Sequence, residues 1–228
     1  MVDGPDGADG AAAIPVPRLK VCGVREMRDV EGALGLGLDA IGLVAWPHSP
    51  RYIDAQHAAA LVRELPRAIL AVAVFVDATP DGARAWLAAS GARGVQLCGG
   101  ERADDWVAFP ALVLRRIAVD ADAEREMRAW QRVAHGFVLD HPSSAGGSGQ
   151  SVDTELASEL ARRAPCLLAG GLDASNVSQR VRSVRPHGVD ASSRLESAPG
   201  TKDPVRVAEF VRRAHAALNA LEREDAAR

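Results

Sequence analysis

The sequence predicts one α/β domain, a closed (β/α)8 barrel of the TIM type, and three observations predict it. From residue 18 onward, short runs of Val, Leu, Ile and Ala alternate with polar segments of helical period, as in repeated strand–helix units. We count eight such units, the number that closes a barrel of parallel strands. No Gly-x-Gly-x-x-Gly stretch follows the first strand, so an open dinucleotide-binding sheet gains no support.

The strands are expected where the apolar runs lie, and helices are expected in the gaps between them. Helix starts are clearest at Asp54, at Thr79–Pro80–Asp81 and at residues 120–124, where capping or acidic side chains can satisfy free N–H groups. The last helix is expected at residues 204–221. The eight predicted strands comprise residues 19–24, 40–45, 69–76, 94–97, 112–118, 136–139, 166–169 and 188–191.

Both ends of the chain are expected to lie outside the barrel. Residues 1–17 are rich in Gly, Ala, Asp and Pro, a composition that predicts a disordered tail. The same segment lacks the basic start and the apolar core of a secretory signal, so we expect a cytoplasmic protein. The barrel domain is expected at residues 18–221, followed by a C-terminal tail at residues 222–228.

Composition restricts the class of partner. The net charge is −3 and Lys and Arg are scattered through helical segments, so no basic stripe indicates nucleic acid. No apolar run approaches the roughly 20 residues of a membrane span. Cys22, Cys98 and Cys166 are widely separated and lack metal-ligand spacing, which predicts reduced thiols and no metal. A small-molecule substrate is the expected partner.

Two apolar strands end in a chemically active side chain. Strand alternation places Lys20 and Cys22 on one face, where the ammonium would favour the thiolate and lower the thiol pKa. Asp140 ends the strand at 136–139, where apolar surroundings would raise its pKa enough to donate a proton near neutrality. The alternatives are a buried Cys packed as a small hydrophobe and an Asp that caps the turn before His141.

Turns after the last two strands are candidates for phosphate binding. Gly170 and Gly171 follow the seventh strand, and Ser192 and Ser193 follow the eighth, where backbone N–H groups of a barrel commonly meet phosphate. The alternative for each is a plain turn. The stretch 146–149, which contains Gly147 and Ser148, is expected to be a closing loop or a third phosphate contact.

Arg51 lies after the second strand and just before a helix, where its guanidinium fork could hold a substrate carboxylate. A solvated loop arginine is the alternative. The six histidines show no shared spacing and are interpreted as surface or helix residues.

Taken together, these residues form a set that resembles phosphoribosylanthranilate isomerases over residues 18–216. The motifs that carry the resemblance are Lys-Val-Cys-Gly at 20–23, Ser-Pro-Arg-Tyr-Ile at 49–53, Val-Phe-Val-Asp at 74–77, Val-Gln-Leu at 95–97, Leu-Asp at 139–140, Gly-Gly-Ser-Gly at 146–149, Ala-Gly-Gly-Leu at 169–172, Asn-Val at 176–177, Val-Asp-Ala-Ser-Ser at 189–193, Pro-Gly at 199–200 and Lys-Asp at 202–203.

The resemblance implies an Amadori rearrangement of a phosphorylated substrate, N-(5′-phosphoribosyl)anthranilate, without cofactor or metal. It implies that Asp140 is the general acid that opens the furanose ring and that Cys22 is the general base that removes the C2′ proton. Arg51 would hold the anthranilate carboxylate. The phosphate would be held by Gly170, Gly171, Ser192 and Ser193, with Gly147 and Ser148.

Three positions depart from the family's usual residues. Cys98 stands where the family usually has His, and Arg25 stands where Thr is common. Arg194 stands where Gly is frequent, and its guanidinium either strengthens the phosphate grip or turns outward.

Three alternatives remain beside this reading. A histidine-pathway isomerase would place Asp at the end of the first strand, where Cys22 stands. Indole-glycerol-phosphate synthase would need a longer N-terminal helical extension and a catalytic Lys/Glu set. A barrel that binds a phosphorylated ligand without turnover is the third. The oligomeric state is expected to be monomer or homodimer.

Overall fold

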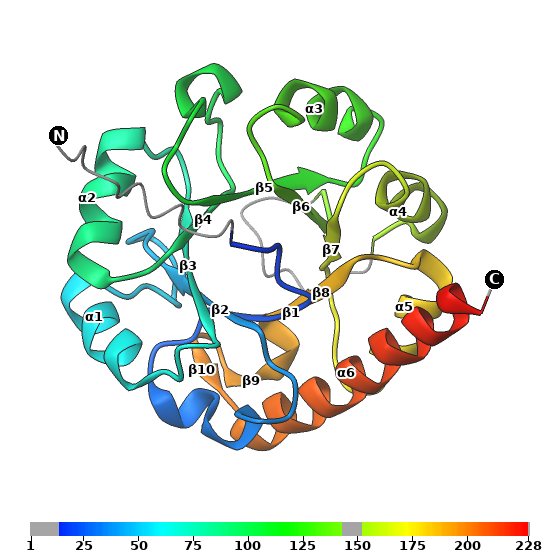
Figure 1. Ribbon diagram of the computed structural model, residues 1–228. Helices are drawn as coiled ribbons and strands as arrows, with labels where there is room; N and C mark the ends of the chain where they lie inside the picture. The colour runs from blue at the N-terminus through cyan, green and yellow to red at the C-terminus, as the bar shows by residue number, and fades with distance from the viewer. Residues whose placement is uncertain (1–13, 143–151, 228) are drawn as a thin grey trace, which may run out of the picture.

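A computed structural model describes residues 14–142 and 152–227, and its centre is a closed barrel of parallel strands in sequence order (Figure 1). This confirms the predicted fold class. Each predicted strand is present, with ends that differ by at most two residues. The strands are β1 (Leu19–Cys22), β2 (Ala40–Val44), β3 (Leu70–Phe75), β4 (Gly94–Leu97), β5 (Leu112–Ala118), β6 (Gly136–Asp140), β7 (Cys166–Leu168) and β8 (Gly188–Ala191).

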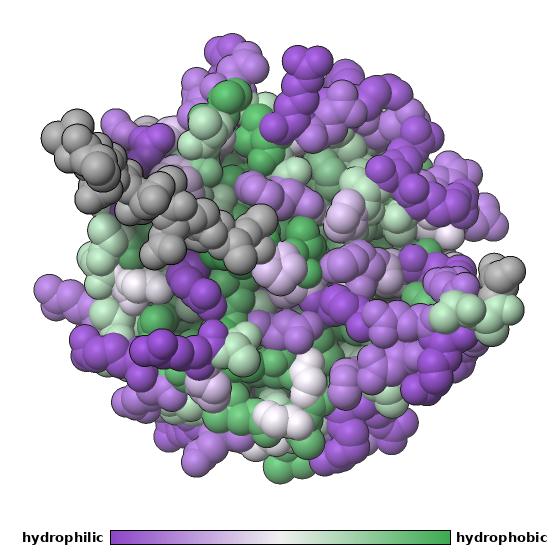
Figure 2. All heavy atoms as spheres, in the orientation of Figure 1, coloured by the Kyte–Doolittle hydropathy of each residue, from purple (hydrophilic) through white to green (hydrophobic). Residues whose placement is uncertain are grey.

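The α-helices form a ring around the barrel, and their outward surfaces are mostly hydrophilic (Figures 1 and 2). The expected caps at Asp54 and Thr79 are present, since each side chain accepts from backbone N–H groups of its helix. The helices are α1 (Ala55–Glu64), α2 (Pro80–Ser90), α3 (Ala123–Trp130), α4 (Thr154–Ala161), α5 (Val177–Val184) and α6 (Pro204–Ala226).

Two gaps expected to hold α-helices contain 3-10 turns instead. Residues 23–39 form η1 (Met27–Asp29) and η2 (Glu31–Ala33), and four glycines in this gap disfavour a longer helix. Residues 98–111 form η3 (Ala103–Trp106).

After β8 the chain makes a further turn, η4 (Ser193–Leu195), and an antiparallel hairpin that the sequence analysis did not predict. The hairpin consists of β9 (Glu196–Ala198) and β10 (Thr201–Lys202). In Figure 1 it lies between strands β1 and β2 of the barrel and α6.

The C-terminal end of the chain differs from the expected tail. The last helix continues to Ala226 rather than ending at residue 221, and Arg185 at the end of α5 pairs with Glu224 and Asp225 in its last turns. Residues 1–13 of the expected N-terminal tail lie outside the described residues. Ile14 and Val16, at its end, pack against the barrel interior.

The strands separate two apolar layers. Outward side chains of the strands pack against the helices, as Leu19 and Val21 do. Inward side chains fill the barrel, and at the amino ends of the strands they are aliphatic: Ala40, Leu70, Val72, Leu112, Leu114 and Leu167. Towards the carboxyl ends the interior becomes polar, and there the cavity described below opens.

Candidate active site

A cavity of about 100 Å³, open to solvent, lies at the carboxyl ends of the strands. Cys22 and Asp140 both line it, as the barrel topology predicts for side chains at the ends of β1 and β6. Six further predicted site residues also line it: Arg51, Gly170, Gly171, Ser192, Ser193 and Arg194. Gly147 and Ser148 lie outside the described residues.

Cys22 faces the interior on the same side of β1 as Lys20, as alternation predicts. Gly42 of β2 makes room for both side chains, since an added Cβ there would lie 2.7 Å from Cys22 Sγ and 3.1 Å from Lys20 Nζ. Burial raises the pKa of the Cys22 thiol above its usual value, and although Lys20 opposes this, Asp190 adds to it. The predicted lowering of this pKa is therefore wrong for the site without substrate, because desolvation outweighs the neighbouring ammonium.

Lys20 is fully buried and its Nζ lies 2.8 Å from Asp190 Oδ2, across neighbouring strands β1 and β8. Burial alone would lower the pKa of Lys20, but the Asp190 carboxylate outweighs it and the pKa is raised. The other oxygen, Asp190 Oδ1, is buried and accepts no hydrogen bond from the described part of the chain. The ammonium beneath Cys22 is thus held in place by a carboxylate 170 residues away.

Asp140 has polar neighbours rather than the apolar surroundings that the sequence predicted. Arg116 Nε lies 3.3 Å from its Oδ2, and the backbone N–H of His141 donates to its Oδ1 at 2.8 Å. Arg116 also donates to the carbonyl of His141 at 2.7 Å. The sequence analysis missed Arg116, although it shares a strand face with Leu112 and Leu114 and comes near the carboxyl end of its strand, the signal that identified Asp140.

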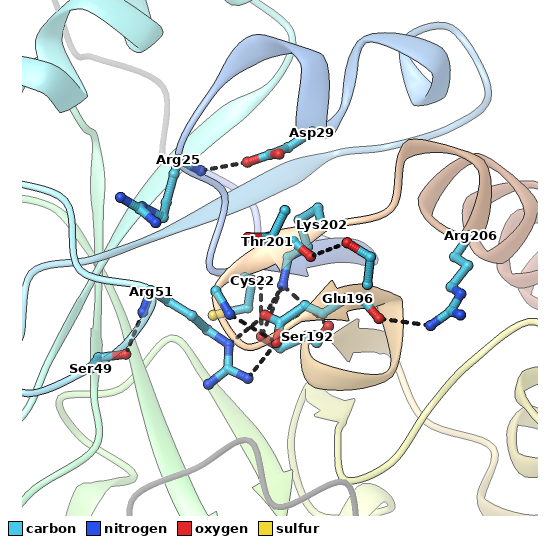
Figure 3. A network of polar contacts seen from close by, with 12 residues as sticks. Cys22, Arg25, Asp29, Ser49, Arg51, Ser192, Glu196, Thr201, Lys202 and Arg206 are labelled. Carbon is cyan, nitrogen blue, oxygen red and sulfur yellow. Dashed lines mark hydrogen bonds and ion pairs between the residues drawn. The ribbon is translucent and has the colours of Figure 1, made fainter.

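Arg51 is not a free loop arginine. Its Nε and Nη2 donate to the two carboxylate oxygens of Glu196 at 2.6 and 2.8 Å, and Lys202 Nζ lies 2.9 Å from Glu196 Oε1 (Figure 3). Burial alone would raise the pKa of Glu196, but hydrogen bonds from the two cations lower it. Glu196 and Lys202 lie on the hairpin, which had no recognisable apolar signal, so sequence reasoning gave neither a role in the site.

The predicted phosphate turns lie side by side at the cavity. Gly170 and Gly171 both have positive φ, 79° and 65°, a conformation that glycine adopts at no steric cost. Ser192 Oγ donates to the Cys22 carbonyl at 2.9 Å and accepts from Lys202 Nζ at 3.3 Å. Its hydrogen is thus committed to the protein, which leaves Ser192 its backbone N–H for a ligand.

The three departures from the family pattern occupy different settings. Cys98 lines the cavity, receives a hydrogen bond from Gln96 Nε2 at 3.5 Å, and has a pKa raised to about 12 by burial. Arg194 is half exposed, lines the cavity, and lies 3.3 Å from Asp173 Oδ2. Arg25 is exposed, with its backbone N–H bonded to Asp29.

Two kinds of feature are absent from the described residues. Residues 14–142 and 152–227 contain no cluster of three or more His, Cys, Asp or Glu side chains able to hold a metal ion. None of the described helices is both long and apolar enough to cross a membrane.

The chain is similar in sequence to proteins of one family. Residues 19–213 match the family model described as N-(5′-phosphoribosyl)anthranilate (PRA) isomerase. An N-(5′-phosphoribosyl)anthranilate isomerase from Myxococcus xanthus is 41% identical over 203 residues, which is 86% of this chain and 95% of that one. The corresponding protein from Chromohalobacter salexigens is 37% identical over 85% of this chain and 92% of its own.

Solved structures agree with the sequences. The phosphoribosylanthranilate isomerase of Thermotoga maritima superposes with a TM-score of 0.80 at 31% identity, covering 88% of this chain and all of that one. A second structure of such an enzyme, in complex with reduced 1-(o-carboxyphenylamino)-1-deoxyribulose 5-phosphate, gives 0.76 at 29% identity, covering 88% of this chain and 100% of its own. With sequence and fold in agreement, this chain belongs to the phosphoribosylanthranilate isomerase family.

Proposed function

We propose that the chain converts N-(5-phosphoribosyl)anthranilate to 1-(2-carboxyphenylamino)-1-deoxyribulose 5-phosphate, the third step from chorismate to tryptophan, by general acid–base catalysis. The observation that carries the residue roles is that Cys22 and Asp140, on different strands, line one cavity together with Arg51. An acid and a base on separate walls can act on two atoms of one substrate.

The first step is proton donation from the Asp140 carboxyl to the furanose ring oxygen. The bond between C1′ and that oxygen breaks, and the nitrogen lone pair forms the C1′=N bond of a protonated Schiff base. Asp140 ends as a carboxylate beside Arg116, whose Nε lies 3.3 Å from Oδ2. The guanidinium therefore favours the charge that this step creates.

The second step is removal of the C2′ proton by the Cys22 thiolate. The electron pair of the C–H bond forms C1′=C2′ and neutralises the nitrogen, which gives an enolamine. Protonation at C1′ and loss of the C2′ hydroxyl proton then give the ketone. The Lys20 ammonium next to Cys22 supports the thiolate, against the burial that raises the thiol pKa.

The two ends of the substrate would be held by different groups that line the cavity. Arg51 would bind the anthranilate carboxylate through the donors that Glu196 leaves unused. The phosphate would be bound by backbone N–H groups of Gly170, Gly171, Ser192 and Ser193, with the Arg194 side chain and with Gly147 and Ser148.

The same proposal includes the setting of the enzyme. We propose a cytoplasmic protein that works on a small phosphorylated substrate, without a nucleic-acid or membrane partner, as a monomer or a homodimer. A Thermotoga maritima relative is described as dimeric. Sedimentation equilibrium of this chain would separate the two oligomeric states.

The test is the loss of anthranilate-type fluorescence when the enzyme is added to phosphoribosylanthranilate generated in situ. We expect turnover by the wild type, and Cys22→Ala and Asp140→Ala proteins that fold but lose orders of magnitude in kcat, since each removes a group that transfers a proton. Cys166→Ala is the matched control, because Cys166 is a buried thiol in the outer layer.

Retention of wild-type kcat by either folded variant would overturn that residue's role. A folded wild type without turnover would favour the alternative in which the barrel binds a phosphorylated ligand only.

A further inference from the structure

The hairpin β9–β10 places two buried charges behind Arg51. The side chains of Glu196 and Lys202 are 4% and 0% exposed. Glu196 Oε1 lies 2.6 Å from Arg51 Nε and 2.9 Å from Lys202 Nζ. Figure 3 shows the three side chains gathered beside Cys22 and Ser192. One carboxylate is therefore shared by two cations.

The hydrogen bonds of Lys202 require its charged form. Nζ donates to Glu196 Oε1, to the Ser192 carbonyl at 3.2 Å and to Ser192 Oγ at 3.3 Å. Ser192 Oγ uses its own hydrogen on Cys22, so all three contacts need hydrogens from Lys202, and only an ammonium has three. Burial lowers the pKa of Lys202, and Glu196 opposes this.

The charge count of this group decides what Arg51 can attract. Arg51 and Glu196 alone sum to zero, and a neutral pair offers an anionic ligand no net attraction. Lys202 raises the sum to one positive charge in a largely buried setting, where screening by water is weak. Glu196 accepts from the Nε–H and from one N–H of Nη2. The two N–H groups of Nη1 and the second N–H of Nη2 are left for a second carboxylate.

We propose that Lys202 is a specificity-determining and positioning residue: it keeps the Arg51–Glu196 pair net positive, so that Arg51 selects ligands that carry an aromatic carboxylate. This rests on the proposed function, in which Arg51 binds the anthranilate carboxylate. Lys202 need not contact the substrate in this role.

A purely structural role must be separated from this electrostatic one. Lys202 also braces Ser192, which holds the Cys22 carbonyl, so its removal disturbs the base and lowers kcat for any substrate. That disturbance does not depend on whether the ligand carries a carboxylate. The discriminating measurement is therefore binding of two ligands that differ in this group alone.

The experiment measures the dissociation constants of reduced 1-(o-carboxyphenylamino)-1-deoxyribulose 5-phosphate and of its analogue without the carboxyl group. Wild type should prefer the carboxylate ligand. In Lys202→Met the ratio of the two dissociation constants should fall by on the order of tenfold, because one nearby positive charge is removed at an effective dielectric constant of about 20. The dissociation constant of the analogue without the carboxyl group should change by less than about threefold.

Two variants complete the test. Lys202→Arg should retain the preference. Glu196→Gln in the Lys202→Met background returns the net charge to one positive and should restore part of the preference, although it cannot restore the brace on Ser192. Equal weakening of both ligands in Lys202→Met, or no recovery in the double variant, would overturn the proposal.

Failure of the proposal and failure of the proposed function give different results. If wild type and Arg51→Gln bind the two ligands with the same ratio of dissociation constants, Arg51 is not the carboxylate site. If Arg51→Gln loses the preference while Lys202→Met keeps it, Arg51 is the site and the role of Lys202 is overturned.

Discussion

The two ends of the barrel interior differ in chemistry although the same strands build both. At the amino end the inward side chains are aliphatic, and Ile14 and Val16 pack against them. At the carboxyl end the same faces carry Cys22, Asp140 and Arg116. Because side chains on one face recur every second residue, a shift of two positions along a strand changes a packing residue into a site residue.

The difference has a thermodynamic consequence. The described carboxyl-end interior contains buried polar atoms without a partner, Gln96 Oε1 and Asp190 Oδ1, and an ion pair between Lys20 and Asp190. An unsatisfied buried polar group costs about 1–3 kcal/mol. The amino end carries the apolar packing that offsets such costs, so stability and function are drawn from opposite ends of the same strands.

The largest expected effect of breaking this division comes from Lys20→Met. It leaves the Asp190 carboxylate buried without its partner, and removal of one member of a buried pair costs about 3–5 kcal/mol of unfolding free energy. It also removes the ammonium beside Cys22, so kcat should fall as well. Urea unfolding and the fluorescence assay measure the two effects.

Leu112→Ala is the matched control from the amino end. A leucine buried there should cost about 2–5 kcal/mol through the cavity it leaves, with kcat unchanged in the folded fraction. If Leu112→Ala reduced kcat as much as Lys20→Met does, the two ends would not be functionally separate.

Local sequence patterns predicted the barrel well because each strand is a local apolar run with the required period. The positions of Cys22 and Asp140 followed from the same local rule. Alternation along β5 also carried the information that places Arg116 in the site, and that signal was not used.

Other features depend on contacts that no local pattern contains. Arg51 and Glu196 are 145 residues apart, and the short hairpin that carries Glu196 shows no apolar periodicity. The raised pKa of Cys22 reflects burial, which arises only after the strands close. The two gaps with 3-10 turns are cases in which turn-forming residues override the alternation of strand and helix.

Two thiols lie in different environments, Cys98 at the cavity and Cys166 in the outer apolar layer. Burial raises the pKa of Cys98, at the cavity, and of Cys166, in the outer layer, each to about 12. The folded state therefore holds these protons more tightly than the unfolded state does. Their stabilisation is complete below the unfolded thiol pKa of about 8.5 and is lost as the pH rises towards about 12.

As the pH rises from 8.5 to 10, each thiol should lower the free energy of unfolding by about 1.5 kcal/mol. Urea unfolding at both pH values measures the loss, and Cys166→Ala should remove its share of the pH dependence. Cys98→Ala should remove a smaller part of the pH dependence than Cys166→Ala does, because the open cavity admits water to Cys98. An unchanged pH dependence in Cys166→Ala would contradict the assignment.

The smallest expected effect lies at the amino end. Val16 is half-buried against the interior, and its carbonyl oxygen lies 3.1 Å from His187 Nε2. Val16→Ala removes two methyl groups from that contact and should lower the unfolding free energy by about 1 kcal/mol. Its neighbour Pro15 is exposed, so Pro15→Ala is the control that changes the same segment without removing the contact.

Because the aliphatic layer of the barrel lies between Val16 and the cavity, kcat and KM of Val16→Ala should equal those of the wild type. Steady-state kinetics at a temperature where both proteins are fully folded measures this. A fall in kcat without loss of stability would show that the amino end influences the site through the strands, and the separation of the two ends would then fail at its weakest point.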